Sequence, residues 1–203
     1  MSTESAARDL PALETARLAL RTLRLDDAAD LFAYARDPEV ARYTSWPAHR
    51  TIADAEAFLE WVVPRYGTPA GLTWGIVRRG DDRLIGTIGL GDWQPQHARA
   101  ELMFALARPH WGRGYMPEAA RAVLAFGFTA LGLNRIQGMC VVENAASARV
   151  MEKVGLRYEG TLREYTYFKG KYDDLKVYAI LCADWLAGAS APPTAGIVPP
   201  PAS

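Results

Sequence analysis

The chain has 203 residues, half of them apolar, and its 23 basic and 23 acidic side chains give zero net formal charge. This length suits one domain, and the apolar content is too high for a disordered protein. The balanced charge argues against a nucleic-acid partner, because such proteins carry a basic excess or stripe. No apolar run reaches the roughly 20 residues that cross a bilayer, and the polar N-terminus lacks the apolar core of a secretory signal. We therefore expect a cytoplasmic protein without a membrane partner.

Both ends of the chain are expected to lie outside the folded body. Residues 1–13 show no sustained pattern, and residues 188–203 are rich in Pro, Ala and Gly, a composition that cannot build a core. The folded body is therefore predicted to span residues 14–187. Cys140 and Cys182 lie in apolar runs and are expected to be buried, reduced thiols. We expect no metal site, because there is no CxxC pair and the three histidines are scattered.

Apolar periodicity predicts elements in the order strand, two helices, three strands, helix, strand, helix and two strands. Strands are expected over 17–24, 72–78, 83–91, 98–107, 135–142, 156–165 and 172–181. Helices are expected after Asp26 and Asp27, after the capping pattern of Thr51 and Asp54, over 117–131 and over 145–154. The strand–helix–strand unit over 98–142 should be a right-handed parallel crossover, and the flanking hairpins should be antiparallel. A mixed sheet covered by helices follows.

The sharpest local signal is the segment Trp111-Gly112-Arg113-Gly114-Tyr115-Met116-Pro117-Glu118, between an apolar strand and a helix. Gly112 and Gly114 allow a tight turn that brings backbone N–H groups close to an anion, and Pro117 suits the first helical turn. The unpaired amides and partial positive charge of a helix start can hold a pyrophosphate without a metal. The alternative is a tight turn with no ligand. Glu118 is expected to point along the helix surface, away from a phosphate.

A second segment, from Asn144 to Leu156, combines a helix start with candidate polar groups. Asn144 is a suitable N-cap residue, and Ser147 falls in the first helical turn. One interpretation is plain capping. The other is that both side chains face a crevice between the strands over 98–107 and 135–142.

These segments together resemble the GCN5-related N-acetyltransferase (GNAT) superfamily over about residues 15–187. The matching motifs are Glu39-Val-Ala-Arg-Tyr43 with Trp46-Pro47, Leu133-Asn-Arg-Ile136, Glu143-Asn144, Ser147-Ala-Arg-Val-Met151-Glu-Lys and Glu159-Gly-Thr-Leu-Arg-Glu164. They look like the branch of the RimJ/RimL-type ribosomal-protein N-acetyltransferases. In the superfamily's pyrophosphate motif only Gly114 matches strictly, since Trp111 replaces Arg or Gln and Met116 replaces a small residue. The resemblance implies an α+β fold with a mostly antiparallel, seven-stranded mixed sheet, a central splayed parallel pair and helices on both faces.

The resemblance also implies acetyl-CoA as co-substrate, wedged between the two splayed strands. Its pyrophosphate would lie on the Gly loop, and its pantetheine arm would bond to exposed strand backbone, as an added strand does. The asparagine of the superfamily's second motif falls on Asn144. The expected cofactor contacts are Phe104, Leu106, Trp111, Gly112, Arg113, Gly114, Tyr115, Met116 and Asn144.

The implied chemistry is attack of a neutral amine on a thioester, which a base assists because free amines are mostly protonated at pH 7. Glu101 is the candidate base, since a glutamate at this position in Rim-type enzymes is thought to act through water. The alternative for Glu101 is a solvated strand-end carboxylate. Ser147 is the candidate acid or hydrogen-bond partner of the sulfur, because Met151 stands where many superfamily members have a tyrosine. If Tyr158 or Tyr165 reached the thioester, the assignment of Ser147 would fail.

The acceptor mouth is expected at the 43–50 loop, the second helix and the 165–172 turn, with Trp46 and Trp93 as an apolar wall. Core packing is the commoner use of a tryptophan, and we assign Trp61 to the core together with Trp74. The amine acceptor is either a protein N-terminus or a small molecule. A polyamine or aminoglycoside is disfavoured, because the loop carries no acidic side chain.

Two other functional classes stay open for the sequence. One is a non-catalytic acyl-CoA-binding domain, which would bind the cofactor without turnover. The other is a nucleotide-dependent enzyme, which the missing lysine and metal-binding carboxylates disfavour, as does the absence of the GxxxxGK(S/T) and GxGxxG patterns. The chain is expected to act as a monomer or a homodimer.

Overall fold

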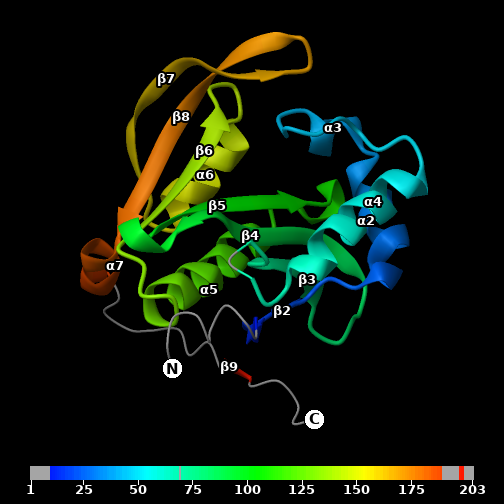
Figure 1. Cartoon of the computed structure of the whole chain (residues 1–203), viewed down its shortest axis with the longest axis horizontal. Coiled ribbons are helices and arrows are strands. Elements are labelled where there is room, and N and C mark those ends of the chain that lie inside the picture. Colours follow the sequence, from blue (N-terminus) through cyan, green and yellow to red (C-terminus); the bar gives the residue numbers. More distant parts are fainter. Residues whose placement is uncertain (1–9, 69, 189–196, 199–203) are drawn as a thin grey trace.

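The computed structural model describes residues 10–68, 70–188 and 197–198, whose strands form one sheet in the order β7-β8-β6-β5-β4-β3-β2-β1-β9 (Figure 1). The strands are β1 (Ala12–Glu14), β2 (Leu18–Arg21), β3 (Thr73–Arg78), β4 (Leu84–Gln94), β5 (Arg99–Leu106), β6 (Arg135–Val141), β7 (Arg157–Phe168), β8 (Lys171–Leu181) and β9 (Ile197–Val198). The α-helices are α2 (Ala28–Ala35), α3 (Pro38–Ala41), α4 (Ile52–Val62), α5 (Tyr115–Thr129), α6 (Ala145–Lys153) and α7 (Cys182–Gly188).

The predicted mixed sheet with a central parallel pair is confirmed. Among the described strands, β5 and β6 pair in parallel, and every other neighbouring pair is antiparallel. Helix α5 connects the two parallel strands, as a crossover between parallel strands requires. The loop expected to hold the cofactor, residues 111–116, therefore lies between the end of β5 and the first residues of this helix. We call it the cofactor loop.

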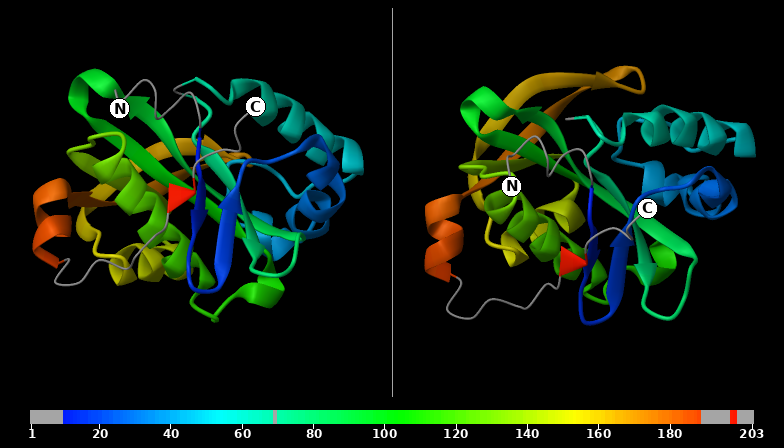
Figure 2. Two further views of the ribbon diagram at one scale, coloured as in Figure 1. Left: turned by 90° about the horizontal axis from the view of Figure 1, so that it is seen from below. Right: turned by 60° about the horizontal axis from the view of Figure 1, so that its bottom comes forward.

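Helices cover both faces of the sheet (Figure 2), as the resemblance implies. Helices α5 and α6 bury their apolar positions in the larger core cluster, where Trp74 of β3 packs edge-on against Phe126 of α5 with ring centroids 5.3 Å apart. Helices α2 and α4 form a second cluster through Leu31 and Leu59. The apolar spacing of each helix thus selects the face that it turns to the sheet.

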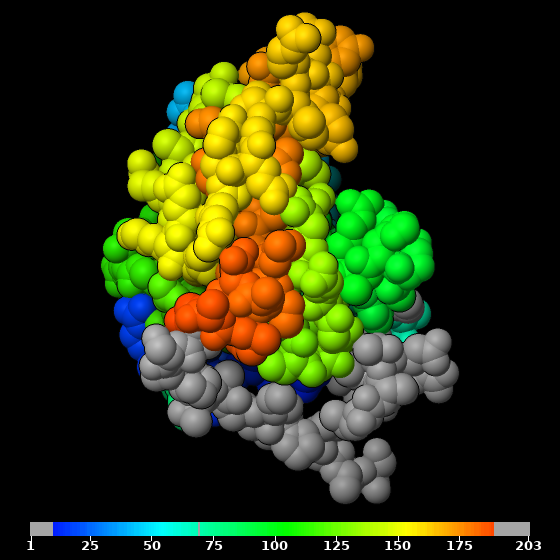
Figure 3. All heavy atoms as spheres, turned by 90° about the vertical axis from the view of Figure 1, so that its left-hand side faces the viewer, coloured from blue at the N-terminus to red at the C-terminus, as the bar shows by residue number. Residues whose placement is uncertain are grey.

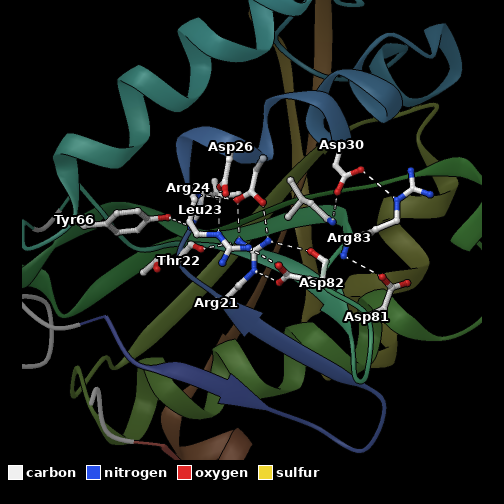
Figure 4. A network of polar contacts seen from close by, with 12 residues as sticks. Arg21, Thr22, Leu23, Arg24, Asp26, Asp30, Tyr66, Asp81, Asp82 and Arg83 are labelled. Carbon is white, nitrogen blue, oxygen red and sulfur yellow. Dashed lines mark hydrogen bonds and ion pairs between the residues drawn. The ribbon is translucent and has the colours of Figure 1, made fainter. Parts of the chain in front are cut away.

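A buried ion pair attaches the α2 layer to the sheet (Figure 4). Asp27, the one buried charged residue among those the structure describes, accepts hydrogen bonds of 2.6 and 2.8 Å from the guanidinium of Arg21 on β2. Arg21 also reaches Asp82 in the β3–β4 turn. A bidentate arginine–carboxylate pair fixes both position and orientation. The start of α2 is therefore held against β2 and this turn.

The sheet contains two described strands beyond the seven predicted. Leu13 of β1 is 1% exposed, and Trp74 Nε1 donates to the carbonyl of Pro11 at 2.8 Å, so the folded body begins before residue 14. Strand β9 pairs with β1 inside the segment 188–203, which the sequence predicts to be unstructured. Strands of two or three residues are too short to show an alternating pattern, which explains why they were not predicted. The remaining parts of both predicted tails lie outside the described residues.

Two further expectations meet different outcomes. Trp74 is fully buried, as predicted, but Trp61 is 54% exposed and lies against the guanidinium of Arg65, with 4.2 Å to the ring centroid. Trp61 falls on the outer side of α4, because Leu59 and Val62 already form the buried side of its last turns. Both cysteines are free thiols, as predicted, but only Cys140 is buried, since Cys182 at the start of α7 is partly exposed. Within the described part of the chain, no helix combines the length and apolar character that a bilayer-spanning segment needs.

Candidate active site

The parallel pairing of β5 with β6 covers only the first part of both strands. It comprises three residue pairs, the last of which joins Glu101 to Gln137. On their other sides, β5 stays paired with β4 as far as Leu106, and β6 stays paired with β8 as far as Val141. The two strands therefore separate after Glu101 and Gln137. We call the facing edges, residues 102–106 and 138–141, the β5–β6 split.

The backbone groups that face the split follow from the ladder between β5 and β4. Ala107 donates its N–H to the carbonyl of Ile85 at 2.8 Å. Backbone groups of successive strand residues point to opposite sides, so Leu106 and Phe104 direct theirs toward the split. The carbonyl of Leu106 already accepts a hydrogen bond of 2.7 Å from Trp111 Nε1. Phe104 therefore offers its N–H and C=O along the split, and Leu106 offers its N–H.

The loop that follows β5 presents backbone amides at the start of α5. Gly112 and Gly114 have φ values of 72° and 77°, in the left-handed region that favours glycine. Among the described residues, the amides of residues 112–116 donate to no backbone carbonyl. A Cβ atom placed on Gly112 would meet nothing within 4 Å. Free donors at a helix start, with open space before them, fit a pyrophosphate group.

Glu101 lies at the last paired position of β5, where the split begins. Burial raises the pKa of its carboxyl above the usual value, and the charge of Asp92 raises it further, whereas a hydrogen bond with Gln137 acts in the opposite direction. Asp92 has a φ of 43° and lies in an irregularity of the β4–β5 ladder just past Gly91, the partner of Glu101. A carboxylate with a raised pKa is a stronger proton acceptor near neutral pH.

Asn144 and Ser147 lie together at the start of α6, beside the far strand of the split. The Asn144 side chain accepts a hydrogen bond of 3.1 Å from the backbone N–H of Ser147, which is the capping geometry. Burial raises the pKa of the Cys140 thiol on β6, against the lowering effects of Lys176 and of a hydrogen bond with Ser147. Ser147 therefore lies in the first turn of α6, beside Cys140 of the far strand of the split.

The other residues considered for the leaving sulfur lie elsewhere. Met151 is 1% exposed, and a Cβ atom placed on Gly138 of β6 would come within 2.6 Å of its sulfur. Tyr158 and Tyr165 lie on β7, which β8 separates from β6. The hydroxyl of Tyr158 pairs with Thr161 at 2.8 Å. The positions of these tyrosines therefore do not compete with Ser147.

The β7–β8 hairpin projects beyond the rest of the surface (Figure 3) and meets α3 at its tip. The ammonium of Lys169 donates to the carbonyl of Ala41 at 2.5 Å, across 128 positions of the chain. Three tyrosines near the tip are more than half exposed, namely Tyr165, Tyr167 and Tyr172. The hairpin tip (residues 165–172) thus contacts α3, which the loop of residues 42–50 follows. We keep the name acceptor mouth for this part of the expected mouth, the hairpin tip with α3 and its loop (the α3 loop).

The two tryptophans expected in the acceptor wall do not pack together. Trp46 is partly buried against the α2–α4 cluster and lies 5.5 Å from the ring of His49. Trp93 packs against the larger cluster that contains α5. The structure gives no support for one wall shared by both indoles, although Trp46 does lie in the loop that follows α3.

Several residues near the candidate site were not identified from the sequence. Gln137 and Asp92 adjust the proton affinity of Glu101, and Cys140 lies beside Ser147. Lys169 joins the two sides of the acceptor mouth. Each of these residues reaches its partner through strand register or through a long-range contact, which apolar periodicity does not report. Gln137 had one available signal, since it is a polar residue inside a strand predicted to be apolar.

Known proteins resemble the chain over most of its length. The uncharacterized N-acetyltransferase YoaA of Bacillus subtilis is 38% identical over 171 residues, which cover 84% of this chain and 97% of that protein. A crystal structure of a GNAT-family acetyltransferase from Bacillus anthracis superposes with a TM-score of 0.76 at 28% identity, covering 85% of this chain and 99% of that one.

Relatives named for their acceptors differ from one another. YdaF of Bacillus subtilis, named as a proposed ribosomal N-acetyltransferase, is 28% identical over 66% of this chain and 74% of its own length. A spermidine N(1)-acetyltransferase of Vibrio cholerae is 31% identical over 55% of this chain and 64% of its own length. Similarity alone therefore does not select a protein or a small-molecule acceptor.

The model of the acetyltransferase (GNAT) domain family matches residues 17–157. This range runs from the start of β2 to the start of β7. It includes the cofactor loop, Glu101 and both edges of the β5–β6 split. The chain belongs to the GNAT family of acetyltransferases, with relatives among the ribosomal N-acetyltransferases, and is an acyltransferase by class.

Proposed function

We propose that this chain transfers an acetyl group from acetyl-CoA to a primary amine, and that the amine is the N-terminus of a protein. The observation that carries the proposal is the β5–β6 split, which opens at Glu101 and Gln137. It runs alongside a loop whose amides 112–116 have no backbone acceptor among the described residues. A strand edge that leads to an anion-receptive helix start fits a ligand with an amide-bearing arm and a pyrophosphate.

In this proposal the cofactor loop holds the pyrophosphate through backbone amides, with Trp111, Arg113, Tyr115 and Met116 completing the loop. Phe104 and Leu106 bond the amide-bearing arm as an added strand would. Asn144 supports the site indirectly, because it caps the helix that carries Ser147. Bound acetyl-CoA supplies the acetyl group as a thioester, and no metal is needed to hold it.

Glu101 accepts a proton from the incoming ammonium, directly or through a water molecule, and so provides the neutral amine. The nitrogen then forms its bond to the carbonyl carbon while the carbon–sulfur bond breaks. The second proton that the nitrogen loses passes through solvent water to the departing thiolate, so the products are an amide and the free thiol of CoA. Ser147 hydrogen-bonds the departing sulfur. A serine hydroxyl is too weak an acid to supply a full proton. None is needed from it, because a thiol with a pKa of about 8.5 is acidic enough to leave as the thiolate.

A protein N-terminus fits the acceptor mouth better than a polycation does. The mouth offers exposed tyrosines, which combine apolar area with a hydrogen-bonding end, and Trp46 lies on its α3 side. The loop of residues 43–50 carries His49 and Arg50 but no acidic side chain. The similarity to a spermidine acetyltransferase supports the alternative of a small polyamine. A domain that binds acyl-CoA without turnover would not need the raised proton affinity of Glu101.

A thiol-release assay with acetyl-CoA separates these acceptors. The panel contains peptides that differ in their first residue, the same peptides with blocked N-termini, and spermidine. We expect release with free N-termini and none with the blocked forms. Release with spermidine alone would assign the enzyme to small amines. Cofactor binding without release from any amine would overturn the proposed transfer.

A further inference from the structure

The first turn of α5 carries an acidic side chain close to the proposed pyrophosphate site. Glu118 follows the free amides of residues 112–116, and its own N–H bonds to the carbonyl of Gly114 at 3.2 Å. An unpaired carboxylate in the helical turn next to a bound phosphate group would repel that group. The site can therefore accept an anion only if the charge of Glu118 is compensated.

The structure compensates that charge from the β1–β2 turn, about a hundred residues earlier in the chain (Figure 2). One carboxylate oxygen of Glu118 accepts from the Thr15 hydroxyl at 2.6 Å and from the Arg17 backbone N–H at 2.8 Å. The other accepts from Arg17 Nε at 2.7 Å and pairs with Arg17 Nη2 at 2.6 Å. Burial alone would raise the pKa of Glu118, but these hydrogen bonds and the charge of Arg17 lower it. Glu118 is thus ionised and paired at neutral pH.

Arg17 also contacts the cofactor loop itself. Its Nη1 donates to the carbonyl of Arg113 at 3.0 Å, and its guanidinium lies 4.7 Å from the centroid of the Tyr115 ring. A Cβ atom placed on Gly114 would lie 3.4 Å from Arg17 Nη2. A single side chain therefore touches three successive residues of the loop.

The contact with the Arg113 carbonyl sets the direction of the next amide. In a planar trans peptide the C=O of one residue and the N–H of the following residue point in opposite directions. Because Arg17 holds the Arg113 carbonyl, the N–H of Gly114 points away from Arg17. Since this N–H also donates to no backbone carbonyl in the described structure, it is free to bond a pyrophosphate at the loop.

From these contacts we propose that Arg17 is a positioning residue for the pyrophosphate of acetyl-CoA. It neutralises Glu118 and orients the Arg113–Gly114 peptide so that the Gly114 amide faces the ligand. Arg17 acts from behind the loop, since its guanidinium is already engaged by the protein. This inference rests on the proposed cofactor loop, and it adds a residue outside the Gly-containing segment.

The test is a set of acetyl-CoA dissociation constants measured by calorimetry. We expect Arg17→Gln to weaken binding about tenfold to a hundredfold, because a charge-assisted bond is lost and a charge is left unpaired beside the ligand. Glu118→Gln alone should stay near wild type. The double variant Arg17→Gln with Glu118→Gln should recover part of the loss, since the repelling charge is gone. Arg17→Lys should lie between wild type and Arg17→Gln.

Arg79→Gln is the matched control. Arg79 lines the same surface depression as Arg17 and Tyr115, but its guanidinium pairs with Glu14 at 3.4 Å and donates to the Thr15 carbonyl at 3.1 Å. No contact of Arg79 with Glu118 or the cofactor loop is seen in the described structure, so it shares the turn but not the proposed role. An equal loss of affinity in Arg79→Gln would assign the effect to general positive charge and overturn the proposal. So would an unchanged dissociation constant in Arg17→Gln, or a double variant as weak as that single variant. Thermal unfolding of each variant shows whether it is folded.

S-acetylpantetheine, which lacks the pyrophosphate, separates this inference from the proposed cofactor site. Arg17→Gln should leave the affinity for this ligand unchanged, because the contact at issue is absent. If the wild-type protein binds S-acetylpantetheine as tightly as acetyl-CoA, the loop does not bind pyrophosphate and the proposed site fails. If the wild type prefers acetyl-CoA and Arg17→Gln keeps that preference, only the role of Arg17 fails.

Discussion

The cofactor loop and the acceptor mouth lie in the same fold but are held in different ways. Arg17 lies in the neighbouring β1–β2 hairpin, from which it contacts Glu118 and three residues of the cofactor loop. At the acceptor mouth, the β7–β8 hairpin reaches the α3 loop through the ammonium of Lys169. The first region is held by several charged contacts of Arg17. The second is held by hydrogen bonds from Lys169 to the carbonyls of Ala41 and Arg42.

The backbone of the hairpin continues this contrast. The pairing of β7 with β8 shifts register between Tyr158 and Gly160 and again between Leu162 and Thr166. Glu164 in the second irregularity has a φ of 48°. Such irregularities bend a strand and increase its twist. In the proposed function acetyl-CoA is the one donor, whereas the relatives are named for different acceptors. The difference in support therefore separates the donor half of the proposed reaction from its acceptor half.

Removing the candidate base should have the largest effect, and it should lower turnover without changing the affinity for acetyl-CoA. Glu101→Gln is expected to lower kcat at neutral pH about a hundredfold or more, because proton transfer by a positioned group contributes this much. The acetyl-CoA dissociation constant should stay near wild type. Steady-state kinetics with a peptide acceptor and calorimetry give the two values. Full activity with an unaltered pH profile would remove Glu101 from the mechanism.

Two glycines with the same backbone conformation can separate the two regions. Gly112 in the cofactor loop and Gly170 in the hairpin turn have φ values of 72° and 84°, and a Cβ on either would meet nothing within 4 Å. Valine in the left-handed region costs roughly 1–2 kcal/mol or more at either position. We expect Gly112→Val to raise the acetyl-CoA dissociation constant about tenfold or more. Gly170→Val should raise only the acceptor KM, and equal effects on both constants would contradict the separation.

The pH profile tests the environment of Glu101. Its raised pKa places the acid limb of kcat/KM above the usual glutamate range, since the base must be ionised to accept a proton. Asp92→Asn removes a negative charge that favours the protonated form. The limb should therefore move to lower pH, by up to about one unit. A limb that stays in place or moves upward would show that Asp92 does not act on the base.

The smallest effect is expected at the acceptor mouth. Lys169→Met removes the contact with the α3 carbonyls and should raise the acceptor KM several-fold, within about tenfold. A hydrogen bond to a charged group contributes roughly 1.5–3 kcal/mol to the fold, and only part of this energy acts on acceptor binding. The acetyl-CoA dissociation constant should not change. Lys171→Met is the matched control, because that ammonium pairs with Asp173 of its own strand. If both variants behave alike, the Lys169 contact does not shape the mouth.

The sequence allowed more of the cofactor region to be predicted than of the acceptor region. The glycines, Pro117 and the capping Asn144 act within a few residues of their own position, so their local roles could be predicted from spacing. Arg17 acts at Glu118 across 101 positions, and the strand predicted over 17–24 gave no indication of this partner. This contact depends on how α5 packs against β2, because the packing decides whether a charged residue beside the strand meets the first turn of the helix.

The same limit explains what was missed elsewhere. The parallel pairing of β5 with β6 could be predicted. Its end at Glu101 and Gln137 could not, because it depends on how β6 pairs with β8 on its other side. Trp61 was assigned to the core because core packing is the commoner use of a tryptophan, a general preference that does not report which side of α4 the residue occupies. Local chemistry could be predicted, whereas register and side-chain partners required the structure.

Backbone amide resonances of 15N-labelled protein, recorded with and without acetyl-CoA, test the central claim most directly. We predict that the largest shifts fall on the cofactor loop, at residues 112–116, and on Phe104 and Leu106 along the split. The amides of residues 99–101, which are already paired with β6, should shift little. Shifts confined to other surfaces, with residues 102–106 and 112–116 unaffected, would contradict the claim that the β5–β6 split and its loop hold the cofactor.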